Sequence, residues 1–161
     1  MTISFYVVVV SDQVFKGKKN DISGEKACEA IASKGYVVKD KIIVPNKFRE
    51  VIRTIYRLKD ADVIVFIGGT GLGPRDLTID VIESIAWRKI PGFGEFFRLK
   101  SYEEIGYRGL LSRAEAYVLG DGRVVVVLPG SPHAVSLGLE ILLNIVDHLV
   151  EEIHRFEGPH K

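Results

Sequence analysis

The feature that most constrains the fold is a pair of continuous apolar runs, rich in β-branched residues, at positions 3–10 and 61–67. A run that is apolar at nearly every position, and not only at alternate positions, is typical of a strand covered on both faces. Parallel strands of this kind need long crossover connections, and helices usually supply them. The runs therefore predict an α/β fold with three α/β/α layers and a mostly parallel sheet.

The rest of the chain alternates between strand and helix patterns. It predicts further strands at 36–44, 114–119 and 124–128, and helices at 23–33, 47–59, about 79–85 and 132 to about 153. Ser23 is the expected cap of the first helix, and Gly35 its stop. The tight turn at 120–122 predicts a hairpin, which adds one antiparallel edge strand to the sheet. Residues 89–111 are expected to be irregular with helical portions.

Composition narrows the class of protein. A chain of 161 residues fits one domain, and its 22 basic and 21 acidic side chains give a net charge of only +1. No global field would therefore attract nucleic acid or an anionic membrane. The one cysteine, Cys28, excludes an intramolecular disulfide framework. Met1 leads directly into an apolar run without a basic leader, and no run approaches the roughly 20 residues of a membrane span, so a cytoplasmic protein is expected.

The most unusual segment follows the strand at 61–67 and reads Gly68, Gly69, Thr70, Gly71. Glycines directly after a buried strand let the backbone turn sharply and bring its amides close to a ligand. Several convergent N–H groups near a helix N-terminus form a binding site for phosphate. The alternative is a tight turn with no ligand, because glycine clusters often mark only that.

Arg75 and Asp76 follow this segment and favour the ligand interpretation. A carboxylate beside a phosphate is repulsive unless a cation lies between them, and Mg²⁺ binds carboxylates together with phosphate oxygens. Asp76 is therefore a candidate Mg²⁺ ligand, and Arg75 a candidate partner for a second phosphate. The alternative role is helix capping, which we expect for Asp80 in a capping box with Glu83.

Two more loops leave the same edge of the predicted sheet. Ser11 and Asp12 end the first strand, and a proline-rich loop opens the last helix with Ser131 as its cap. The members of that loop are Pro129, Gly130, Ser131 and Pro132. Glu95 and Ser112 are polar residues of the long irregular segment that could cover the site. The four histidines, His133, His148, His154 and His160, show no metal-ligand spacing.

Three of these motifs, in this order, resemble the MoaB/MogA family of molybdenum cofactor biosynthesis proteins. They are Ser11-Asp12, Gly68-Gly69-Thr70-Gly71 with Asp76, and Leu128-Pro129-Gly130-Ser131-Pro132. The segments Pro91-Gly92-Phe93-Gly94-Glu95-Phe96 and Leu111-Ser112-Arg113-Ala114 are also similar to that family. The resemblance covers roughly residues 5–150, and the compact length is closest to MoaB, including its archaeal members.

This resemblance implies an enzyme that transfers the adenylyl group of ATP to molybdopterin and releases pyrophosphate. It implies Mg²⁺, with ATP and molybdopterin as substrates, and a homotrimer, possibly paired into a hexamer. It also assigns roles, with Asp76 as the match to a family catalytic aspartate. The glycine segment, Asp12 and the Pro129 loop would bind the substrates.

At one position the chain departs from the family. A second functional aspartate follows the proline after the second strand in adenylylating members, and Asn46 stands there in this chain. Asparagine can ligate a cation through its carbonyl oxygen but brings no charge. Two alternatives therefore stay open beside the transferase, a non-catalytic molybdopterin-binding or scaffold protein and a nucleotide hydrolase.

Overall fold

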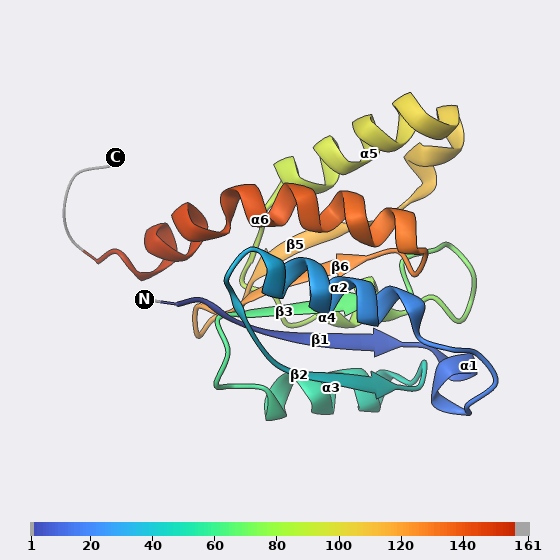
Figure 1. Cartoon of the computed structure of the whole chain (residues 1–161), viewed down its shortest axis with the longest axis horizontal. Helices are drawn as coiled ribbons and strands as arrows, with labels where there is room; N and C mark the ends of the chain where they lie inside the picture. Colours follow the sequence, from blue (N-terminus) through green and yellow to red (C-terminus); the bar gives the residue numbers. More distant parts are fainter. Residues whose placement is uncertain (1, 157–161) are drawn as a thin grey trace.

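The computed structural model describes residues 2–156 of the chain. Within them a six-stranded sheet has helices on both faces, so the predicted three-layer α/β/α fold is confirmed (Figure 1). The strands are β1 (Ser4–Val10), β2 (Val37–Val44), β3 (Val63–Ile67), β4 (Arg88–Lys89), β5 (Glu115–Val118) and β6 (Val124–Leu128). The helices are α1 (Asp12–Phe15), α2 (Ile22–Ser33), α3 (Phe48–Arg57), α4 (Thr78–Glu83), α5 (Pro91–Ile105), the 3₁₀ helix η1 (Gly106–Leu111) and α6 (Pro132–His154).

The order of the strands places the loops that could bind a ligand. The sheet runs β2-β1-β3-β6-β5-β4, and its first four strands are parallel. The predicted hairpin is present, because β5 pairs antiparallel with β6, and the two-residue strand β4 follows beyond it. The chain moves from β1 outward to β2 and then back across β1 to β3. A crevice opens where the connections diverge, at the carboxyl ends of β1 and β3.

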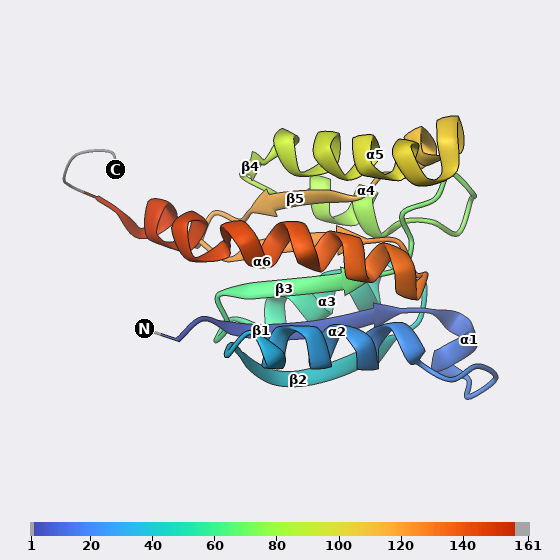
Figure 2. The ribbon, with the colours of Figure 1, turned by 45° about the horizontal axis from the view of Figure 1, so that its top comes forward.

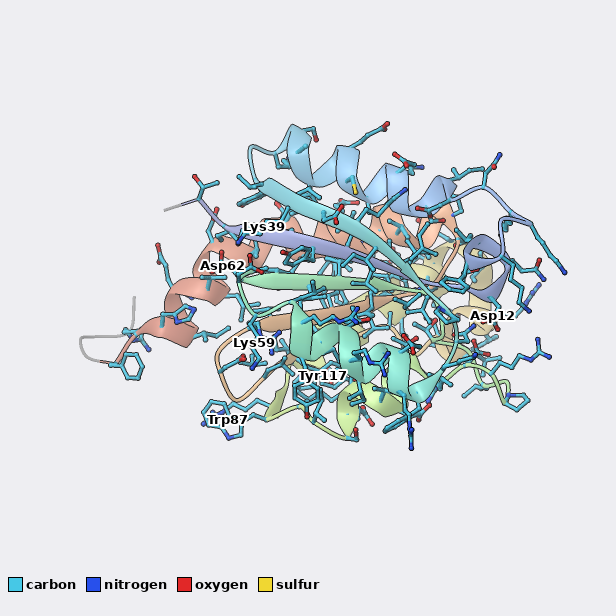
Figure 3. All side chains as sticks on the ribbon, turned by 90° about the horizontal axis from the view of Figure 1, so that it is seen from below. Asp12, Lys39, Lys59, Asp62, Trp87 and Tyr117 are labelled. Carbon is cyan, nitrogen blue, oxygen red and sulfur yellow. The ribbon has the colours of Figure 1, made fainter. Side chains whose placement is uncertain are left out.

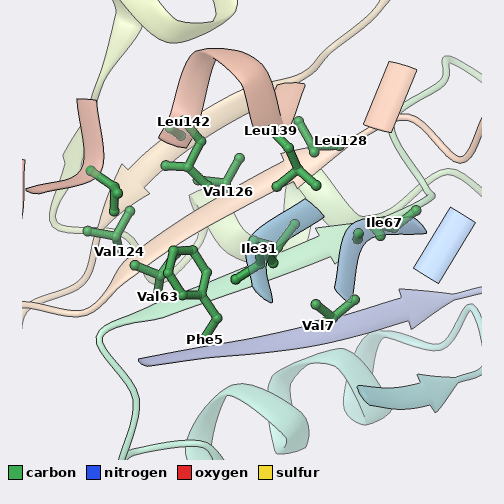
Figure 4. Close-up of a cluster of buried hydrophobic side chains, with 14 of the residues drawn as sticks. Phe5, Val7, Ile31, Val63, Ile67, Val124, Val126, Leu128, Leu139 and Leu142 are labelled. Carbon is green, nitrogen blue, oxygen red and sulfur yellow. The ribbon is translucent and has the colours of Figure 1, made fainter. Parts of the chain in front are cut away.

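Both faces of the central strands are buried, as the continuous apolar runs predict. Figure 2 shows α2 and α6 in front of the sheet and α3 and α4 behind it. Alternate residues of β1 divide accordingly, with Val7 and Val9 in one core cluster and Val8 and Val10 in the other. Figure 4 shows the first cluster, which includes Phe5 from β1 and Ile31 from α2. Each such side chain contributes about 1.5–3 kcal/mol relative to exposure.

Helix α6 is long and apolar enough to cross a membrane by length and composition alone. Its inward residues, Val135, Leu139, Leu142 and Val146, are instead fully buried against the sheet. The helix is therefore accounted for as a core helix of this domain.

The expectation of an irregular segment with helical portions at 89–111 was right about the helical portions but wrong about the irregularity. The structure has β4 and then the 15-residue helix α5, which Pro91 begins and Gly106, with φ of 73°, ends. Gly92 and Gly94 weaken the helical signal in the sequence. Packing overrides that weakness, because Phe93 and Phe97 are 2% exposed and lie one helical turn apart.

Two expected caps are also corrected, although Gly35 does end α2 as predicted. The side chain that caps α2 is Asp21, which accepts a hydrogen bond from Gly24 N–H at 2.8 Å. The Ser23 hydroxyl instead donates to the Gly130 carbonyl at 2.6 Å. Asp80 lies inside α4, which has no side-chain cap, and is paired elsewhere.

Candidate functional site

A cavity of about 480 Å³ lies at the carboxyl ends of β1 and β3. Predicted site residues from three loops line it, namely Ser11, Gly68, Gly130, Ser131 and Pro132, together with residues 19–23. Asp12 is next to this group, at the end toward which the strands point and opposite the end that carries Asp62 (Figure 3). The sheet topology thus gathers loops that are far apart in the sequence.

The turn after β3, the glycine turn of residues 68–72, requires glycine at its start for steric reasons. Gly68 and Gly69 have φ of 105° and 73°, in the region that side chains rarely adopt. A Cβ on Gly68 would lie 2.4 Å from the Val10 carbonyl oxygen, and one on Gly69 would lie 2.1 Å from Thr78 Oγ1. The backbone after β3 therefore passes directly against β1 and the start of α4.

The amides of this turn are free to bind a ligand. Within residues 2–156, the N–H groups of Gly69, Thr70, Gly71 and Leu72 donate to no protein oxygen. The Thr78 hydroxyl behind the turn is fully buried and also has no partner among these residues. Consecutive unpaired amides form an anion-binding concavity.

A second cavity, of about 300 Å³, shares this turn and the Pro129 loop. Its lining includes Thr70, Ser112, Pro129 and Ser131, with further residues from α5, η1 and α6. Ser131 lines both cavities. The glycine turn and the Pro129 loop therefore lie between two spaces, and each space is large enough for a small-molecule fragment.

Asp12 and Asn46, predicted from different motifs, are brought together. The Asn46 N–H donates to Asp12 Oδ1 at 3.0 Å. Asn46 Oδ1 is buried and has no hydrogen-bond partner in residues 2–156. The backbone contact fixes Asn46 next to Asp12, and carboxylate and amide oxygens are ligands that Mg²⁺ accepts when phosphate and water complete its coordination.

The Asp76 side chain lies against the glycine turn. Asp76 Oδ2 accepts a hydrogen bond from Gly73 N–H at 3.1 Å, and a Cβ on Gly71 would lie 2.7 Å from the same oxygen. Asp76 is half-buried, whereas Arg75 is exposed and makes no hydrogen bond or ion pair within the described part of the chain. Of these two predicted residues, only Asp76 is held beside the turn.

Helix ends contribute the remaining polarity of the crevice. Ser131 caps α6 by accepting from Ala134 N–H at 3.2 Å, as predicted, and Ser11 caps the short helix α1 by accepting from Val14 N–H at 3.2 Å. The positive end of the α6 dipole therefore faces the crevice. Both hydroxyls still have a free O–H donor for a ligand oxygen.

One charged pair stabilises the cavity wall formed by residues 19–23. Asp21 forms an ion pair with Lys41 at 2.7 Å. Burial lowers the pKa of Lys41, but hydrogen bonds to Asp21 and Glu25 outweigh burial and leave the pKa raised. Lys41 therefore stays charged and supports the wall at neutral pH.

Other predicted residues divide between the site and the surface. Ser112 lines the second cavity, but Glu95 is exposed on α5 and lines neither of the two cavities. His133 contacts Glu104, and both line the second cavity. The described residues contain no cluster of three His, Cys, Asp or Glu side chains suited to a metal, and His160 lies outside them.

Sequence reasoning missed Arg113. Its guanidinium donates to carbonyl oxygens of Thr70, Gly71 and Asp76 and forms an ion pair with Asp80. These partners are 33 to 43 residues away in the sequence, so no local pattern could have indicated them. The only signal was its place in the Leu111-Ser112-Arg113-Ala114 segment of the family resemblance.

The fold and the crevice define a doubly wound α/β protein whose candidate ligand site is the switch point of its sheet. Sequence comparison narrows this class. The chain belongs to the probable molybdopterin-binding domain family, whose model matches residues 6–148, and the resemblance noted from the motifs is thereby confirmed.

Individual relatives extend this assignment. The chain is 42% identical over 154 residues to a molybdopterin adenylyltransferase of Pyrococcus furiosus, covering 93% of this chain and 90% of that protein. It is 34% identical to a probable molybdopterin adenylyltransferase of Methanocaldococcus jannaschii, with 92% of each covered. The crystal structure of the tungsten cofactor synthesizing protein MoaB from Pyrococcus furiosus superposes with a TM-score of 0.89 at 40% identity, covering 96% of this chain and 98% of that one.

Proposed function

We propose that this protein is a molybdopterin adenylyltransferase that acts in the biosynthesis of a molybdenum or tungsten cofactor. The observation that carries the proposal is the row of amides at Gly69–Gly71, which have no acceptor within residues 2–156 and lie between two cavities. A reaction that joins two phosphorylated substrates needs an anion site where two binding spaces meet. The names of relatives that match nearly the whole chain support the same activity.

The proposed chemistry needs no covalent intermediate on the protein. An oxygen of the terminal phosphate of molybdopterin forms a bond to the α-phosphorus of ATP. The bond from that phosphorus to the bridging oxygen of the β-phosphate breaks, and pyrophosphate leaves with the electron pair. Transfer of this kind depends on positioning and on neutralising charge.

The residues of the crevice can supply both the positioning and the charge neutralisation. The amides after β3 hold phosphate oxygens, and the N-terminus of α6 adds a partial positive charge. Asp12 and Asn46 offer two oxygens for Mg²⁺, and the unpartnered Asn46 Oδ1 supports that fit. Bound Mg²⁺ would neutralise charge on the leaving pyrophosphate. Asp76, whose carboxylate is held against the turn by Gly73 N–H, would orient the attacking substrate or contribute to the cation.

A non-catalytic molybdopterin-binding protein is the second candidate. Asn46 favours it, because an amide beside Asp12 leaves the cation with one carboxylate instead of two. Pyrophosphate release distinguishes the two candidates, because a binding protein would retain molybdopterin without consuming ATP.

The test is a pyrophosphate-release assay with molybdopterin, Mg²⁺ and ATP. Asp76→Asn is the informative variant, because its amide oxygen can still accept from Gly73 N–H while the charge is lost. We expect turnover to fall about 100-fold, the usual scale for a lost electrostatic contact to the transition state. Asp147→Asn, on the exposed face of α6, is the matched control. Absence of molybdopterin-dependent turnover in the unaltered protein would contradict the proposed function.

We also propose that the protein assembles with copies of itself, as a trimer or a hexamer of paired trimers. Helices α5 and η1 leave several large apolar side chains exposed, namely Phe96, Leu99, Ile105, Tyr107, Leu110 and Leu111. Extensive exposed apolar surface usually marks a protein interface. Light scattering tests this, and a monomeric mass would contradict it. The cytoplasmic location expected from the sequence stays a prediction.

A further inference from the structure

Arg113 makes more contacts with the glycine turn than any residue predicted from the sequence. Its Nε donates to the carbonyl oxygens of Thr70 at 3.2 Å and Gly71 at 3.1 Å. Its Nη2 donates to Gly71 O at 2.8 Å and to Asp76 O at 3.0 Å. One guanidinium therefore holds three backbone carbonyls, two of them consecutive.

The planarity of the peptide group makes these contacts important for the amides. In a trans peptide, the C=O of one residue and the N–H of the next point in opposite directions within one rigid plane. Holding the Thr70 and Gly71 carbonyls toward Arg113 therefore directs the Gly71 and Leu72 N–H groups away from it. Those two N–H groups are among the amides without a protein acceptor in residues 2–156.

The guanidinium is itself fixed on its other side. Asp80 accepts from Nη1 at 2.9 Å and from Nη2 at 3.2 Å, which is a two-point carboxylate contact. The planar fork of arginine can satisfy such a carboxylate and several carbonyls together, and an ammonium group lacks this geometry. Asp80, which the sequence suggested as a helix cap, instead orients Arg113.

A second arginine holds the backbone on either side of Arg113. Arg98 donates to the carbonyls of Ser112 at 3.3 Å and Ala114 at 3.2 Å, and it forms an ion pair with Glu115 at 2.9 Å. Glu115 is 5% exposed, and Gly94 leaves room for it, because a Cβ there would lie 2.3 Å from Glu115 Oε2. The segment that carries Arg113 is thereby anchored in the interior.

We propose that Arg113 is a positioning residue that orients the Gly71 and Leu72 amides toward the phosphate groups of the substrate. It touches no substrate itself and acts through the backbone of the turn. The proposal rests on the proposed function for the identity of the substrate, a nucleoside triphosphate. The orientation of the amides depends only on contacts within the chain.

Calorimetric binding of Mg–ATP and of inorganic pyrophosphate to the full-length protein tests the proposal, with turnover measured in parallel. Arg113→Ala should raise the dissociation constant and lower kcat by about 100-fold each, the scale on which the loss of an oriented donor changes a rate. Arg113→Lys should change both by about tenfold. Asp80→Asn keeps the contacts of Arg113 with the three carbonyls, so its binding and kcat should fall less than those of either Arg113 variant. Arg53→Ala replaces an exposed arginine on α3 that pairs with Glu50; it is the matched control and should behave as the unaltered protein.

The dissociation constant separates positioning from a merely structural role. A variant that is only less stable has fewer active molecules, but its folded fraction binds pyrophosphate with unchanged affinity. Added guanidinium ion should partly restore binding to Arg113→Ala. If that variant does not fold, weaker pyrophosphate binding by folded Arg113→Lys supports the proposal, and unchanged binding overturns it.

The proposed function can fail separately. Pyrophosphate binding that depends on Arg113, in a protein that does not adenylylate molybdopterin, would support the positioning role and overturn the transferase. Molybdopterin-dependent turnover that persists unchanged in Arg113→Ala would support the transferase and overturn the positioning role of Arg113. An unaltered protein that binds neither Mg–ATP nor pyrophosphate would overturn both.

Discussion

Replacing Gly69 with alanine places a methyl group where the structure has no space for one. The new Cβ would lie 2.1 Å from Thr78 Oγ1 and 3.0 Å from Thr78 Cβ. Gly17 is a matched control, because its φ is 72° against 73° for Gly69 and a Cβ there meets nothing within 4 Å. The two substitutions therefore share the backbone strain and differ in the close approach.

The magnitudes follow from these two terms. A left-handed conformation costs a residue with a side chain about 1–2 kcal/mol, and this cost applies to both variants. Overpacking a filled interior adds about 1–3 kcal/mol, and only Gly69→Ala incurs it. We therefore expect about 1–2 kcal/mol of lost stability for Gly17→Ala and about 2–5 kcal/mol for Gly69→Ala.

Urea unfolding followed by far-ultraviolet circular dichroism measures both losses. All variants are compared at one protein concentration, because the stability of an oligomer depends on concentration. The m value should stay constant while the midpoint moves. Thr78→Ala, combined with Gly69→Ala, should recover part of the loss, because it removes the hydroxyl that the new methyl group meets.

Two results would refute this reasoning. Equal losses for Gly69→Ala and Gly17→Ala would mean that the close approach to Thr78 has no energetic consequence. Additivity of Gly69→Ala and Thr78→Ala within about 0.5 kcal/mol would mean that the two side chains do not interact.

Further predictions concern stability, reactivity and the cation. Arg123 is 7% exposed and donates to the carbonyls of Ile55 at 2.7 Å and Leu58 at 2.8 Å. Arg123→Ala should cost about 2–4 kcal/mol in urea unfolding, because both carbonyls lose their charged donor. Burial raises the pKa of the Cys28 thiol, with Lys41 opposing the rise, so its thiolate forms at higher pH than in the unfolded chain. Alkylation by iodoacetamide at pH 8.5 should therefore be slower in native protein than in urea. Asn46→Asp should lower the Mg²⁺ concentration that half-saturates turnover by about tenfold, equivalent to about 1.4 kcal/mol, because it adds a carboxylate.

Each of these predictions has its own control. Arg53→Ala should leave the free energy of unfolding within about 0.5 kcal/mol of that of the unaltered protein, as surface substitutions do. If Arg123→Ala loses no more free energy of unfolding than Arg53→Ala, the carbonyl contacts of Arg123 do not have the stabilising role given to them. Equal alkylation of Cys28 in native and unfolded chains would contradict its burial. Asn144→Asp, on the exposed face of α6, should not change the Mg²⁺ dependence. If Asn46→Asp does not change it either, Asn46 is not beside the cation.

Local patterns predicted the elements that local patterns can specify. The runs at 3–10 and 61–67 became β1 and β3, because a continuous apolar stretch must be covered on both faces. Gly35 became the stop of α2 with φ of 88°, a conformation that glycine adopts without steric cost. Ser131 became the cap of α6, because its hydroxyl can reach the amide three residues on.

Helix α5 and Asp80 show where such patterns fail. Two glycines make residues 91–105 a poor helix in isolation, yet Gly94 is the residue that admits the buried Glu115 side chain. The Asp80–Glu83 spacing is that of a capping box, but the structure pairs Asp80 with Arg113 from a segment 33 residues further along the chain. In both cases a distant partner decided the outcome over local propensity.

The sequence by itself determined the layers of this protein and the edge of the sheet where its loops gather. Apolar periodicity and the conformational range of glycine are properties of neighbouring residues, so they can be read without a structure. The tertiary structure alone decided which polar groups meet, such as Asp12 with Asn46 and Arg113 with the carbonyls after β3. Most buried polar groups find a partner, and packing between elements far apart in the chain determines which partner lies within reach.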